Sequence, residues 1–227
     1  MGNSSLHIQP TLFDFSDSAT GVAELFPSVW CALEDFTAPN AEVRHQALDR
    51  LIEIGAHRLS PLVAYVLATR LADHDIEIRF RVIQALGDVL SPQDASMEAP
   101  EPVRQHIKFY VSQMRRRNIY ALLQVAEHKI SAESSVAVLL NACSFAGNAL
   151  IDIFTDRKTS LPIRRQAIIF VGRVGFLDAI PPLEKLADRL AARVNGQSTM
   201  PFAPPTETDD KSLLPAVQTA LTLLKTP

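Results

Sequence analysis

The sequence is poor in glycine, cysteine and tryptophan, with eight, two and one of these residues among 227. So few glycines in a chain that is 47% hydrophobic exclude a fibrous class and argue against disorder of the main body. Both cysteines, Cys31 and Cys143, stand in apolar helical contexts without the spacing of metal ligands. We therefore expect two buried thiols in a reducing compartment, with no disulfide and no bound metal.

Long apolar runs and strong charge are also missing. No uninterrupted apolar stretch approaches the ~18 residues that a membrane helix needs, so we expect no membrane partner. The first residues lack a basic segment followed by an apolar core, which predicts a cytoplasmic protein. The net charge of −3 and pI of about 6.1 give no overall attraction to nucleic acid or anionic lipid.

Motifs of catalysis are not found. The sequence has no glycine-rich phosphate loop, no nucleophile elbow and no zinc spacing, and its six histidines never stand at ligand-like distances from each other or from cysteine. We therefore predict no catalytic residues and no cofactor, and expect a protein that is not an enzyme.

What the sequence does contain is a repeated amphipathic pattern. Apolar residues recur at steps of four, four and three after Asn40 and again after Asp75, which places each set on one face of a helix. The two sets are Val43, Ala47, Leu51 and Ile54, and Ile78, Val82, Leu86 and Val89. Asn40 and Asp75 each precede the first apolar residue by three positions, so we predict that both are N-caps.

Three further stretches fit the same template. They are Ile163, Ala167, Val171 and Val174; Leu213, Val217, Leu221 and Leu224; and Ala132, Val136, Leu140 and Cys143, for which Ser131 is the better predicted cap. The combination of cap, apolar residue and arginine recurs at 40–44, 75–79 and 160–164. This combination indicates an internal repeat.

The run from Asp75 to Gly87, DIEIRFRVIQALG, resembles the short bacterial type of HEAT repeat, D-x-x-V-R-x-x-A-x-x-A-L-G. Residues 40–54 and 160–172 match it more loosely. The resemblance implies an all-α fold, an α-solenoid of about five stacked antiparallel helix pairs. It implies almost nothing about the partner, because this repeat serves many unrelated scaffolds.

The expected organisation is an N-terminal tail, 1–21, followed by a single HEAT-like domain, 22–227. The tail can dock through Phe13 and Phe15. We expect Trp30, with Phe26 and Phe36, to form the core of a capping helix. The expected elements of the domain are the capping helix 22–37, helix pairs 41–72, 76–116, 132–155 and 161–193, an extra helix 117–128, a flexible loop 194–208 and a C-terminal helix 210–225.

Residues 103–126 contain no acid and five cations, which are Arg104, Lys108, Arg115, Arg116 and Arg117. If they lie on one helix, Arg104, Lys108 and Arg115 fall within about 40° of each other. One interpretation is a partner-binding basic stripe for phosphate, nucleic acid or an acidic helix. The other is a solvated face, in which the three consecutive arginines end a helix and suit its dipole. The negative overall charge favours the solvated face.

The repeated arginines, Arg44, Arg79 and Arg164, are interpreted as a structural ladder in which each pairs with a cap or acid of a neighbouring repeat. An anion site is the alternative interpretation.

Three functions remain open from the sequence. The first is a non-catalytic protein–protein interaction scaffold or regulatory subunit. The second is a nucleic-acid-binding or DNA-repair protein that uses the basic stripe, because some DNA glycosylases are built from HEAT-like repeats. The third, supported by the resemblance in fold alone, is a tetrapyrrole lyase-type subunit. The oligomeric state and the identity of the partner do not follow from the residues.

Overall fold

The computed structural model of the chain describes residues 26–92, 98–194 and 210–226. All regular structure in these ranges is helical and no strand occurs there, so the predicted all-α class is confirmed. The predicted tail 1–21, the start of the predicted capping helix and all but the first residue of the predicted loop 194–208 lie outside the described residues.

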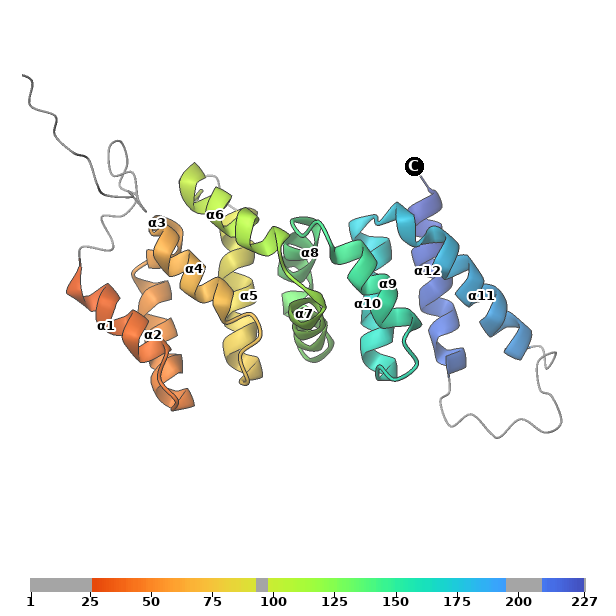
Figure 1. Ribbon diagram of the computed structural model, residues 1–227, viewed down its shortest axis with the longest axis horizontal. Helices are drawn as coiled ribbons and strands as arrows, with labels where there is room; N and C mark the ends of the chain where they lie inside the picture. The colour runs from red at the N-terminus through yellow and green to blue at the C-terminus, as the bar shows by residue number, and fades with distance from the viewer. Residues whose placement is uncertain (1–25, 93–97, 195–209, 227) are drawn as a thin grey trace, which may run out of the picture.

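Figure 1 shows the helices following one another along the longest axis of the molecule, from α1 at one end to α11 and α12 at the other. Short 3₁₀ turns at Ile130–Ala132, Leu177–Ala179 and Asp210–Leu213 lead into α8, α11 and α12. In chain order the helices are α1 Pro27–Phe36, α2 Ala41–Glu53, α3 Ala56–Leu59, α4 Pro61–Thr69, α5 Ile76–Leu90, α6 Glu101–Ser112, α7 Arg116–His128, α8 Glu133–Asn141, α9 Ala146–Thr155, α10 Leu161–Val174, α11 Ile180–Val194 and α12 Leu214–Lys225.

Two of the predicted helix caps are confirmed and two are wrong, since Ser160 stands before α10 but its side chain makes no capping hydrogen bond. The side chains of Asn40 and Asp75 accept hydrogen bonds from the backbone amides two residues further on, at 2.9 and 2.8 Å. Each bond satisfies one of the free amides of the first helical turn. Ser131 does not cap α8, because it lies inside the 3₁₀ turn Ile130–Ala132 and α8 begins without a side-chain cap.

The predicted apolar stripes lie in the core. The α5 stripe and the stripe that ends at Cys143 are buried throughout. Ile54 is the clearest exception, because it stands at the C-cap of α2, where the helix ends and the side chain turns to solvent. Val174 and Leu221 are only partly buried. The helical period therefore identified the core face of each helix and failed mainly at helix ends.

Two glycines allow close helix packing at equivalent places in the repeated pattern. Gly87 and Gly172 stand twelve residues after Asp75 and Ser160. A Cβ on Gly87 would lie 2.5 Å from the Ser135 Cβ of α8, and one on Gly172 would lie 2.8 Å from a backbone atom of α12. A side chain at either position would push the facing helix away, so α5 contacts α8, and α10 contacts α12, over backbone.

The repeated arginines tie neighbouring elements together. Arg44 is buried and donates to the backbone carbonyl groups of residues 38 and 39 at 3.0 and 2.8 Å and to Asp73, before α5, at 3.2 Å. Arg79 donates to Gln124 of α7 at 2.7 Å, and Arg164 donates to the Phe154 carbonyl of α9 at 2.9 Å. The predicted pairing with a neighbouring acid is thus confirmed for Arg44. Arg79 bonds an amide and is also attracted by the charges of Asp73 and Asp75, and Arg164 bonds a carbonyl.

The first described helix corrects two predictions. Trp30 is 49% exposed, Phe26 is also exposed, and Phe36 alone of the three aromatic residues is buried. Cys31 is an exposed thiol, while Cys143 is buried as predicted. The reason is that α1 packs on α2 through one face, so the opposite face, including Trp30 and Cys31, has no helix over it among the described residues.

Candidate partner-binding surface

The predicted basic stripe does not lie on one helix. Helix α6 ends at Ser112 and α7 begins at Arg116, so Arg115 precedes a new helix and does not share a face of α6 with Arg104 and Lys108. One detail of the second interpretation is wrong as well, because the three consecutive arginines, although exposed, lie at the beginning of a helix, where the dipole disfavours cations. The apolar period concealed the break, since Met114 is buried although it lies in the turn.

The five cations differ in their partners. Arg104 is paired with Glu98 and Glu101, and Arg116 donates to Asp156 at 2.7 Å. Hydrogen bonding by the Lys158 amide and by Arg116 holds the pKa of the Asp156 carboxyl below its usual range. Within the described part of the chain, the exposed side chains of Lys108, Arg115 and Arg117 have no acidic partner. Of the five predicted cations, these three are therefore the ones that can pair with another molecule.

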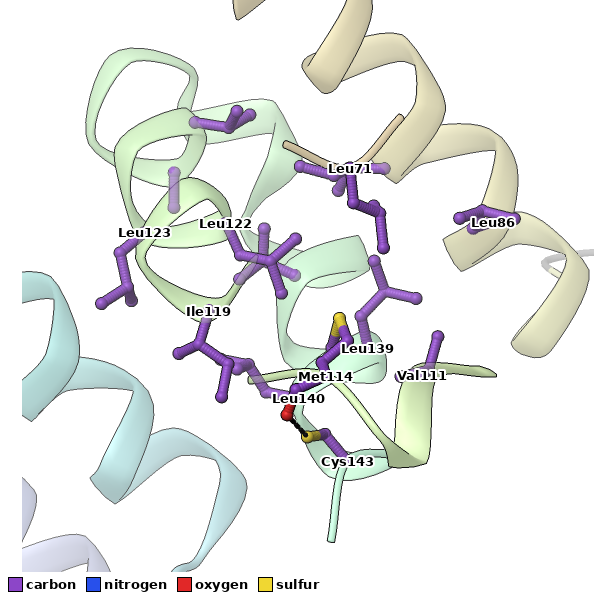
Figure 2. Close-up of a cluster of buried hydrophobic side chains, with 14 of the residues drawn as sticks. Leu71, Leu86, Val111, Met114, Ile119, Leu122, Leu123, Leu139, Leu140 and Cys143 are labelled. Atoms are coloured by element: carbon purple, nitrogen blue, oxygen red, sulfur yellow. Dashed lines mark hydrogen bonds between the residues drawn. The ribbon is translucent and has the colours of Figure 1, made fainter. Parts of the chain in front are cut away.

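The turn between α6 and α7 crosses the turn between α8 and α9. The Cys143 thiol donates a hydrogen bond of 3.6 Å to the Met114 carbonyl, and both side chains are almost fully buried. Figure 2 shows this bond at the edge of a cluster of buried side chains that includes Val111, Ile119 and Leu140. Burial raises the pKa of the Cys143 thiol, which keeps it protonated as a donor. The two turns are therefore held against each other by the core.

One pocket lies on each side of this crossing. The first has a volume of about 460 Å³ and is lined by Lys108, Phe109 and Ser112 of α6 and by the end of α8. The second has a volume of about 620 Å³ and is lined by residues 113–116 and by α9 with the residue before it, Phe145. We call the two together the twin-pocket surface. It is built from the ends of helices, so three of the five predicted cations, Lys108, Arg115 and Arg116, reach it from two different elements.

Each pocket of the twin-pocket surface combines an exposed phenylalanine with an unpaired cation. Phe109 is 68% exposed beside Lys108, and Phe145 is 60% exposed in the pocket that Arg115 lines. Exposed aromatic side chains grouped with polar residues mark interaction sites on otherwise soluble surfaces. The arrangement can bury apolar side chains of a partner and neutralise its carboxylates. The residues that line it include no nucleophile with an adjacent base.

The two phenylalanines were not predicted from the sequence. The helical period of apolar residues does not distinguish an exposed aromatic residue at a helix end from a core residue.

A further pocket, of about 540 Å³, lies away from the twin-pocket surface, between α2, α3 and α5, and was not predicted. Its lining includes His57, which is 3% exposed and whose Nδ1 atom has no hydrogen-bond partner. Burial lowers the pKa of His57 to about 4, and burial raises the pKa of Asp88 against the opposing charge of Arg58. Arg81 is paired with Asp49. Since the charges of this pocket are balanced from within, it offers less to a charged partner than the twin-pocket surface does.

In the described ranges, no group of three histidine, cysteine or acidic side chains gathers closely enough to hold a metal ion. In the same parts of the chain, none of the helices is both long and apolar enough to cross a membrane.

No known family model matches the chain, and no curated protein matches its sequence. The function therefore has to be argued from the surface itself.

Proposed function

We propose that this chain is a HEAT-like α-solenoid that binds another protein, as a scaffold or regulatory subunit, and catalyses no reaction. The repeated cap, stripe and arginine support the repeat assignment, and so does the equivalent position of Gly87 and Gly172 at close helix contacts. The sequence predicts α2 with α4, α5 with α6, α8 with α9 and α10 with α11 as helix pairs, and α7 as an insertion. Among the described helices the consecutive neighbours in closest contact are instead α1 with α2, α9 with α10 and α11 with α12, so we propose these as the repeated pairs.

The observation that carries the binding proposal is the twin-pocket surface. Burying each exposed phenylalanine ring against a partner contributes about 2 kcal/mol. Lys108 and Arg115 add attraction to an acidic segment, which raises the rate of encounter and selects against basic partners. A surface with two such anchors fits the usual anatomy of protein interfaces, in which a few aromatic and basic residues dominate the binding free energy.

Nucleic acid remains the second candidate partner and has weaker support. Arg104 and Arg116 are already paired with acids, so few cations remain to neutralise a run of phosphates. Nothing in the pockets favours a tetrapyrrole. A cytoplasmic location is part of the proposal, and the free thiols Cys31 and Cys143 support it because disulfides are rare in that compartment.

The test is affinity capture from nuclease-treated lysate of the native host, with Phe109→Ala/Phe145→Ala as the variant. The matched control is Ile130→Ala/Leu177→Ala, which removes two apolar side chains that are 81% and 62% exposed elsewhere. We expect a discrete protein to be captured by the wild type and the control and to be lost from the phenylalanine variant. Recovery of nucleic acid alone before nuclease treatment, or equal loss in both variants, would contradict the proposal.

A further inference from the structure

Two stretches of the sequence have opposite charge bias. Residues 103–126, which supply Lys108 and Arg115 to the twin-pocket surface, contain no acid, and residues 1–43 contain no lysine or arginine. Within the second stretch, the segment 12–17 reads LFDFSD, with two phenylalanines and two aspartates in six residues. This segment lies outside the described residues.

We propose that segment 12–17 binds the twin-pocket surface of the same molecule. Phe13 and Phe15 would pack on the apolar walls that Phe109 and Phe145 form, and the two aspartates would lie against the unpaired cations. This inference rests on the proposed function in one respect, since it takes the surface to be a peptide-binding site. It also specifies the partner, which has to be an acidic segment with aromatic or large aliphatic side chains in order to displace the segment.

The segment has enough chain to reach the surface. Ten residues join Phe15 to Phe26, the first described residue, and ten extended residues span up to about 33–36 Å. Helix α1 contacts α2, α2 contacts α5, and α5 contacts α6. Three interhelical steps of about 8–10 Å each therefore separate α1 from α6, which is within that reach.

Attachment to the same chain makes a weak contact effective. Attachment through a short stretch of the same chain gives a local concentration in the millimolar range, so a segment of modest affinity occupies the surface until a tighter acidic partner competes with it. The surface then exposes its phenylalanines to solvent only in the minor, open form. Masking of this kind lowers the apparent affinity of every partner by the occupied fraction.

The test uses the full chain with a benzoylphenylalanine crosslinker in place of Phe13, irradiated at low protein concentration and mapped by mass spectrometry. We expect crosslinks within one molecule to residues 108–116 or 141–149. Changing Lys108→Glu together with Arg115→Glu should lower their yield roughly tenfold, because two attractions become repulsions. The matched control Arg157→Glu/Lys158→Glu, which reverses two exposed cations after α9, should leave the yield unchanged.

A charge exchange makes the test specific. Adding Asp14→Lys and Asp17→Lys to the Lys108→Glu/Arg115→Glu chain should restore the crosslinks, since the signs are again complementary. Crosslinks that map elsewhere, that join two molecules only, or that are not restored would overturn the inference. Residues 195–209 also lack lysine and arginine. If a crosslinker in place of Phe202 reacted with the twin-pocket surface while one in place of Phe13 did not, the inference would be overturned too.

The inference and the proposed function fail separately. If partner capture depends on Phe109 and Phe145 while Phe13 crosslinks elsewhere, the proposed function stands and the inference is wrong. If Phe13 crosslinks to the surface but no partner is captured, the inference stands and the scaffold proposal is wrong.

Discussion

His57 should make the stability of this protein sensitive to mild acid. The side chain is 3% exposed, and burial lowers its pKa from 6.5 to about 4, with the nearby Arg58 charge acting in the same direction. The unfolded chain therefore binds a proton at a pH where the folded chain does not. Above pH 6.5 both states are neutral and His57 has no effect. As the pH falls from 6.5 towards 4, the unfolded state is progressively favoured.

The magnitude follows from the two pKa values. Each pH unit in this window costs up to about 1.4 kcal/mol, so lowering the pH from 7 to 5 should remove about 2 kcal/mol of unfolding free energy through His57. Because the imidazole is buried, solvent screening does not reduce this figure appreciably. In a domain of ordinary stability that is a large fraction of the total.

The perturbation is His57→Gln, which removes the titration and keeps an N–H group that can donate to the Leu51 carbonyl, to which the imidazole is hydrogen bonded. The assay is urea unfolding of both proteins at pH 7, 6 and 5 and constant ionic strength. The wild type should lose about 2 kcal/mol more than the variant between pH 7 and 5. Parallel losses in the two proteins would refute the reasoning, because they would place the proton uptake elsewhere.

Other titrating groups do not confuse this comparison. The pKa of Asp75 is lowered, its interactions with His45 and with the first turn of α5 outweighing burial. Its contribution to stability is therefore lost only as the pH falls through that lowered value, below the window used. The pKa of Asp88 is raised by burial, so it acts in the opposite direction to His57, but it is present in both proteins and cancels in the difference.

Two further predictions concern packing and accessibility. Gly87→Ala should lower the unfolding free energy by about 1–3 kcal/mol, because its Cβ would overlap Ser135, and Ser135→Gly in the same chain should recover part of the loss in urea unfolding. Gly147→Ala is the control, since its added Cβ meets only a movable phenylalanine ring at 3.1 Å, and equal losses for the two alanine variants would contradict the contact. Cys31 should react with maleimide in the folded protein and Cys143 only after unfolding, as followed by intact-mass spectrometry; equal rates would show that the α8–α9 turn opens.

The parts of this structure that short-range physics determines could be read from the sequence. Asn40 and Asp75 cap their helices because their short polar side chains reach the free backbone amides of the first helical turn. The α5 stripe is buried because its period matches one face of a helix. These features need only the residues within one or two helical turns.

The parts that were missed depend on neighbours. No glycine or proline marks the break between α6 and α7, and Met114 continues the apolar period through it, so the basic residues were placed on one helix. Trp30 is half exposed because, among the described residues, α1 packs mainly on α2 through its opposite face. The pocket around His57 requires three elements to meet, and no local pattern indicates which residues will face one another across them.

The twin-pocket surface depends on the turn that joins α6 to α7. Helix α5 packs directly on α8, and α7 lies against α5, α8, α9 and α10. The chain turns after Ser112, and this turn brings Met114 onto the Cys143 thiol and places Arg115 and Arg116 in one pocket with Phe145. The buried side chains hold the turn in place, while Lys108 and Phe109 reach the surface from the end of α6. Changes at Arg115 and Arg117 should thus alter the proposed binding while the core, including Met114 and the stripe of α5, keeps its packing.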